Sequence, residues 1–120
     1  MNTSLQGGVA YHVHNHIATV QFQHPQSNSL PAHLLNQLAQ TFHALGNDDD
    51  CRVIILKSEG EKAFCAGASF DELLAVTNET EGKTFFSGFA HLINAMRKCP
   101  KLIIGRVQGK TVGGGVGIAA

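Results

Sequence analysis

The strongest constraint on this chain is the glycine-rich segment near its end, G-G-G-V-G over residues 113–117. Glycine costs a helix about 1 kcal/mol per position relative to alanine, so a helix that opens on glycines needs a reason. The usual reason is close approach of another group to the backbone, with free N–H groups at the helix start facing negative charge. We therefore expect an anionic atom near this segment.

A second loop of small residues, F-C-A-G-A-S over residues 64–69, has the same local setting. It follows an apolar segment at 52–57, just as the glycine run follows an apolar segment at 102–107. Two such loops facing each other would hold one oxygen between two backbone N–H donors. The pattern predicts an oxyanion hole.

Composition narrows the class of protein. The chain has 120 residues, is 43% hydrophobic and has a formal net charge of +0, which suits a single domain and gives no reason to expect nucleic acid or an anionic membrane as partner. No apolar run approaches the roughly 20 residues that span a bilayer, and no signal peptide is visible. Cys51, Cys65 and Cys99 are odd in number and widely spaced, which argues against disulfides or a zinc site. We expect a cytoplasmic protein.

The first half of the chain predicts a hairpin and a helix. After a disordered leader at 1–7, the segments 9–14 and 17–22 alternate in character around a two-residue turn. A helix follows, with Ser29 as its N-cap and Pro31 in its first turn. Its predicted apolar face consists of Leu34, Leu35, Leu38, Phe42 and Leu45.

The second half predicts further helices between two strands. Ser69 and Glu72 form a capping-box pattern for a short helix at 70–75. A longer helix is expected near 79–98, and a strand at 102–107 precedes the glycine-opened helix. The predicted apolar face of the longer helix is Phe85, Phe86, Phe89, Leu92, Ile93 and Met96. The element order ββαβααβα predicts the α/β class.

The glycines allow other interpretations. Residues 105–111 resemble a phosphate loop but have three residues between the glycines where that loop has four. Residues 115–120 fit a dinucleotide fingerprint, but the acid expected about 20 residues later falls beyond the chain. Tight helix packing alone remains an alternative.

Two other features are candidates for a chemical role, a set of histidines as metal ligands and a cysteine as a nucleophile. His12, His14 and His16 alternate along a predicted strand, but we expect them to be surface residues and not metal ligands. Cys65 has no identifiable base beside it, which favours a packing residue over a nucleophile.

Three segments resemble the enoyl-CoA hydratase/isomerase (crotonase) superfamily. Residues 62–70 look like its F-C-A-G-A-D loop, and residues 101–115 are similar to its K-P-x-I-A-x-V-x-G-x-x-x-G-G-G segment. Residues 24–30 are similar to its R-P-x-x-x-N-A-L turn. The segments keep the family's order and spacing along essentially the whole chain.

The resemblance implies a crotonase-like spiral of ββα repeats, cut after the start of a central helix. Residues 8–120 would then be the N-terminal part of an acyl-CoA-binding domain. It further implies an acyl-CoA thioester as partner, no cofactor besides the coenzyme A of the substrate, and assembly as a homotrimer or homohexamer.

The resemblance also implies site residues. The backbone N–H groups of Ala68 and Gly114 would form the oxyanion hole. The other substrate-binding positions would be Ser27, Ala66, Ser69 and Phe70. Ser69 and His24 depart from the family's usual Asp and Arg.

Gly117 stands where two-glutamate hydratases have their first catalytic Glu, and the second Glu would follow residue 120. The G-G-G-V-G-I variant resembles a subgroup that includes methylglutaconyl-CoA hydratases. We expect a hydratase-type lyase acting on a 2,3-enoyl-CoA thioester, with a Δ3,Δ2-enoyl-CoA isomerase or a non-catalytic acyl-CoA-binding subunit as alternatives. The 120-residue chain alone is not expected to catalyse turnover, since it offers no well-placed general base.

Overall fold

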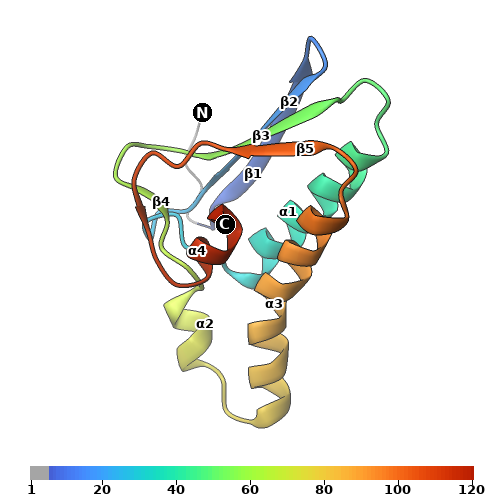
Figure 1. Ribbon diagram of the computed structural model, residues 1–120. Coiled ribbons are helices and arrows are strands. Elements are labelled where there is room, and N and C mark those ends of the chain that lie inside the picture. Colours follow the sequence, from blue (N-terminus) through green and yellow to red (C-terminus); the bar gives the residue numbers. More distant parts are fainter. Residues whose placement is uncertain (1–5) are drawn as a thin grey trace.

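The computed structural model describes residues 6–120, which form a four-stranded sheet with helices on one face (Figure 1). The elements in chain order are β1 (Gly8–His14), β2 (Ile17–Gln23), α1 (Ala32–Gly46), β3 (Val53–Ser58), β4 (Ala63–Cys65), α2 (Phe70–Leu74), α3 (Glu79–Lys98), β5 (Leu102–Gly105), β6 (Lys110–Thr111) and α4 (Gly114–Ala119). The expected α/β class is confirmed. Residues 1–5 of the predicted leader lie outside the described residues.

The predicted hairpin is present. Strands β1 and β2 pair antiparallel from Gly8↔Gln23 to His14↔Ile17. Asn15 and His16 join them with φ angles of 50° and 67°. Positive φ at both turn residues matches the right-handed twist of the flanking strands, which is why a two-residue connection suffices here.

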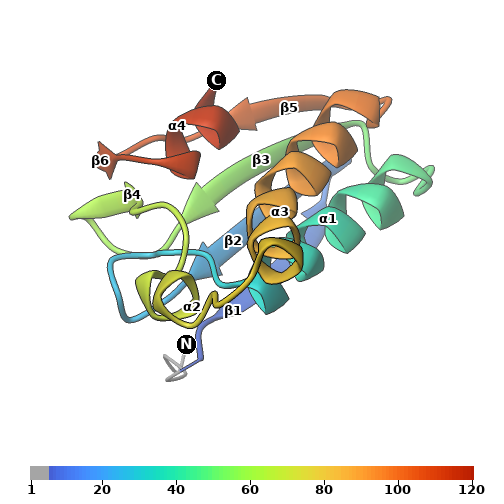
Figure 2. The same cartoon turned by 90° about the horizontal axis from the view of Figure 1, so that it is seen from below.

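The sheet then grows by parallel addition, in the order β1-β2-β3-β5. Strand β3 pairs parallel to β2, and β5 pairs parallel to β3. Parallel neighbours need a crossover. Helix α1 makes the first crossover and α3 belongs to the second, and both lie on the same face of the sheet (Figure 2).

The core lies between that face and the helices. Alternate residues of β2 and β3 are buried, because successive side chains of a strand point to opposite faces. All of the apolar positions predicted for α1 are buried, namely Leu34, Leu35, Leu38, Phe42 and Leu45.

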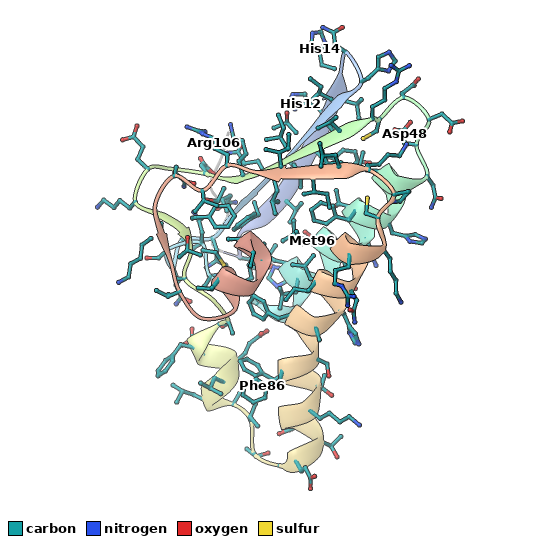
Figure 3. The ribbon with its side chains drawn as sticks, in the orientation of Figure 1. His12, His14, Asp48, Phe86, Met96 and Arg106 are labelled. Atoms are coloured by element: carbon teal, nitrogen blue, oxygen red, sulfur yellow. The ribbon has the colours of Figure 1, made fainter. Side chains whose placement is uncertain are left out.

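Helix α3 has the predicted length, and its predicted apolar face is mostly half-buried, with Phe89 and Met96 packed against the core. Leu92 is its one buried residue, and Phe86 is 68% exposed. Phe86 lies on the part of α3 that projects away from the sheet (Figure 3), where its ring packs edge-on against Phe85 with the ring centroids 4.9 Å apart. No helix among the described residues is long and apolar enough to cross a membrane.

Local boundaries needed correction. Pro31, not Ser29, is the N-cap of α1, and it provides no side-chain cap. The strand expected at 102–107 ends at Gly105. Strands β4 and β6 were not predicted, because segments of 3 and 2 residues are too short to show an alternating pattern.

Candidate functional site

The short strands β4 and β6 bring the two small-residue loops together. They pair in parallel, with Cys65 opposite Thr111. The Val112 N–H continues the pairing by donating to the Cys65 carbonyl at 3.1 Å. Because parallel strands leave a sheet at the same end, the loop after β4 and the glycine turn before α4 start side by side (Figure 2).

The same strand rules out a phosphate loop at 105–111. Lys110 and Thr111 form β6 instead of opening a helix. The strand–loop–helix context that cradles a phosphate is therefore missing from this segment.

The glycines allow the two loops to touch. Gly67 has a φ of +95°, and a Cβ placed on it would lie 3.2 Å from the Val112 carbonyl oxygen and 3.5 Å from the Gly114 nitrogen. A Cβ on Gly115 would lie 2.8 Å from both the Cβ and the carbonyl oxygen of Cys65. Backbone meets backbone here, so the glycines serve a close approach, as the sequence suggested.

The Ala68 N–H is a free donor. Leu30 and Ala68 form an isolated parallel bridge, in which the Leu30 N–H donates to the Gly67 carbonyl at 2.7 Å. The bonds of such a bridge involve the neighbours of Ala68, so its own N–H points away from Leu30. Within residues 6–120, no group accepts a hydrogen bond from it.

The Gly114 N–H is a second free donor. Gly113 precedes it as the N-cap of α4, with a φ of +58°. The next two N–H groups, those of Gly115 and Val116, donate to the Val112 and Gly113 carbonyls at 3.0 and 3.1 Å. The first N–H of the helix has no acceptor in the described chain. Two free N–H groups thus lie on two loops in contact.

The remaining predicted site residues surround these loops in different ways. Ala66 is partly buried between β4 and Gly67. Ser69 is buried, and its hydroxyl accepts from the Glu72 N–H at 3.3 Å. Phe70 is 66% exposed at the start of α2, which leaves its ring available to a ligand. Ser27 is exposed in the turn before Leu30, with a φ of 58°.

Asn28 is a structural residue that the sequence analysis did not single out. It is buried, and its side-chain amide donates to the carbonyls of Glu59 at 2.8 Å and Ala63 at 2.9 Å. Its side-chain oxygen accepts from the His24 N–H at 3.0 Å. Asn28 therefore ties the turn that carries Ser27 to β4. An asparagine in a turn, able to adopt positive φ, was the available signal.

Cys65 is a packing residue, as expected. Burial raises the pKa of its thiol, although the Gly67 N–H donates to its sulfur at 3.4 Å and partly opposes the shift. A thiol with a raised pKa is a poor nucleophile.

The histidines behave as surface residues. His12 and His14 lie exposed on the β1–β2 hairpin (Figure 3), and His16 lies in its turn. Among residues 6–120, no group of three or more His, Cys, Asp or Glu side chains could hold a metal ion.

Two carboxylates, Glu72 and Asp71 of α2, lie next to the loops. The Glu72 Oε1 accepts from the Ala32 N–H at 2.9 Å. Asp71 makes a longer contact, 3.4 Å from its Oδ2 to the Gln26 amide nitrogen.

Comparison with known proteins identifies the family. Residues 12–120 match the model of the family described as enoyl-CoA hydratase/isomerase. The chain belongs to this family. It is 36% identical to the mitochondrial methylglutaconyl-CoA hydratase of Rattus norvegicus over 92 residues, which are 77% of this chain and 29% of that protein. It is 32% identical to the mitochondrial 3-hydroxyisobutyryl-CoA hydrolase of Gallus gallus over 94 residues, 77% of this chain and 24% of that protein.

Solved structures of this family share the fold. The crystal structure of an enoyl-CoA hydratase from Bacillus anthracis superposes with a TM-score of 0.83 at 27% identity, covering 95% of this chain and 44% of that one. The fold is therefore crotonase-like, as the resemblance implied. The chain spans less than half the length of these relatives.

Proposed function

We propose that the protein carrying this chain is a hydratase-type lyase that adds water across the double bond of a 2,3-enoyl-CoA thioester. The observation that carries the proposal is the pair of free backbone N–H groups, Ala68 and Gly114, on loops that touch. Membership of the enoyl-CoA hydratase/isomerase family supports a coenzyme A thioester as substrate.

The chemistry follows from where charge develops. Addition of water at the β-carbon moves electrons onto the thioester oxygen and gives an enolate. Two fixed donors, the Ala68 and Gly114 N–H groups, would stabilise that oxygen at no reorganisation cost. The step needs no cofactor beyond the coenzyme A of the substrate.

The general base is proposed to lie outside residues 1–120. Gly117 has no side chain, and Glu72 is held by the Ala32 N–H. We expect the 120-residue chain to bind thioesters without turnover, because the hole alone activates no water. The likeness to methylglutaconyl-CoA hydratase favours hydration over isomerisation, and an isomerase would use the same two donors.

The test removes each donor by proline substitution in the whole protein. We expect Ala68→Pro and Gly114→Pro to lower kcat for hydration of crotonyl-CoA by about 10²–10³, the usual cost of one oxyanion donor. Ala68→Gly is the first control. Gly114→Ala is the second control. Any side chain at Gly114 meets the Phe89 ring, 2.5 Å from the new Cβ, but alanine keeps the backbone N–H, so this variant measures the effect of the clash alone.

Circular dichroism checks the fold of each variant. Proline variants that fold and retain near-normal hydration would contradict the assignment of the donors. Turnover of a 3-enoyl-CoA to its 2-enoyl isomer, with no hydration, would assign the isomerase reaction instead.

A further inference from the structure

Helix α1 begins without a cap of its own. Its N-cap is Pro31, which makes no side-chain hydrogen bond. The first N–H groups of a helix lack intrahelical partners, and a carboxylate is the partner they favour. Glu72 of α2 supplies it: its Oε1 accepts from the Ala32 N–H at 2.9 Å, across 40 positions of sequence.

This contact completes a frame around Ala68. On one side of Ala68, the Gly67 carbonyl accepts from the Leu30 N–H at 2.7 Å. On the other side, the Ser69 hydroxyl accepts from the backbone N–H of Glu72 at 3.3 Å, and the Glu72 carboxylate holds Ala32. The loop is thus fastened on both sides of Ala68 to residues 30–32.

We propose that Glu72 is a positioning residue for the oxyanion hole. By holding α2 against the first turn of α1, its carboxylate fixes the direction of the Ala68 N–H. Direction matters because an oxyanion donor works only about 2.7–3.1 Å from the oxygen, and a 1 Å misplacement can cost about 10²-fold. The inference rests on the proposed function.

Asp71 provides a matched control. It is the neighbouring residue of α2, has the same charge and is exposed. Its contact to Gln26 is 3.4 Å long and does not reach the backbone of α1. Asp71→Ala therefore removes the same charge from the same helix without releasing Ala32.

The experiment compares two ligands by calorimetry on the full chain. Acetoacetyl-CoA has an acidic α-proton and ionises readily to an enolate, which presents a negatively charged oxygen, whereas butyryl-CoA presents a neutral thioester. We expect Glu72→Ala to weaken acetoacetyl-CoA about tenfold, the effect of one charge-assisted hydrogen bond, and butyryl-CoA less than twofold. Glu72→Gln should restore affinity, since its amide oxygen can accept from the same N–H. Asp71→Ala should leave both affinities unchanged.

The outcomes separate the two proposals. A wild-type chain without preference for acetoacetyl-CoA would overturn the proposed function. A wild-type preference that survives Glu72→Ala would overturn the positioning role alone. The positioning role is also wrong if Glu72→Ala weakens both ligands equally with a lowered melting temperature, or if Glu72→Gln behaves like Glu72→Ala.

Discussion

The two loops that carry the free N–H groups are held in place by different forces. The first loop, residues 66–69, is fastened by hydrogen bonds to residues 30–32 and by the Ser69 cap. The second loop, residues 112–115, has one hydrogen bond to β4, from the Val112 N–H to the Cys65 carbonyl, and is otherwise fixed by close contact. Cβ atoms on Gly114 and Gly115 would lie 2.5 Å from the Phe89 ring and 2.8 Å from Cys65.

This difference predicts which kind of substitution should disturb each loop. A hydrogen bond contributes about 1 kcal/mol to stability, so loss of one bond should loosen the first loop by a small step. Close-packed backbone atoms cannot move aside, so one added methyl group in the second loop should destabilise the folded protein.

The largest effect is expected from Gly115→Ala. The new Cβ meets the Cβ and carbonyl oxygen of Cys65, both at 2.8 Å, and the backbone atom cannot rotate away. We expect a loss of about 1–3 kcal/mol in the free energy of unfolding, measured by urea denaturation, although alanine is the better helix former.

Gly105→Ala is the control for this substitution, because its Cβ would meet only Val107, at 3.9 Å. It should change stability by less than about 0.5 kcal/mol. Equal losses of stability in Gly115→Ala and Gly105→Ala would contradict the conclusion that close packing fixes the second loop.

A smaller effect is expected from Ser69→Ala, which breaks a hydrogen bond of the first loop. Loss of this cap should cost about 1 kcal/mol of stability, by urea denaturation, and should weaken acetoacetyl-CoA binding. Asn78→Ala removes the corresponding cap of α3, where the Asn78 side chain accepts from the Glu81 N–H at 2.8 Å. It should cost similar stability without affecting the ligand. A ligand effect in both variants would show that the first loop has no special role.

The smallest effect concerns pH and the turn that precedes the first loop. Burial lowers the pKa of His24 below its usual 6.5, aided by the nearby charge of His33 and opposed by Asp71 and Glu72. Because the unfolded chain takes up the proton first, this contribution to stability is complete above about pH 6.5 and is lost as pH falls through the lowered value.

We expect His24→Asn to flatten the decline in melting temperature between pH 7 and pH 5. The asparagine oxygen can replace the ring nitrogen that accepts from the Gln26 N–H at 3.1 Å, and it does not titrate. An unchanged pH profile would exclude His24 as the source of the decline.

Residues with local signals were placed correctly from sequence. The hairpin turn at Asn15 and His16, the apolar face of α1 and the cap at Ser69 each depend on neighbours within a few positions. The run of glycines near Gly114, which is unfavourable in a helix, likewise indicated a close contact, and the family motifs indicated the fold. The sequence determined these features because turn geometry, helix periodicity and capping are local physics.

Contacts between segments far apart in the sequence were decided by the tertiary structure alone. Strands β4 and β6 are too short to show a pattern, so their pairing, which sets the two loops side by side, exists only in three dimensions. Pro31, not Ser29, is the N-cap of α1, and the first N–H of that helix donates to Glu72, 40 positions away from Ala32. Such a partner leaves no trace in the local sequence, since a backbone N–H can donate to any carboxylate that the fold brings within reach.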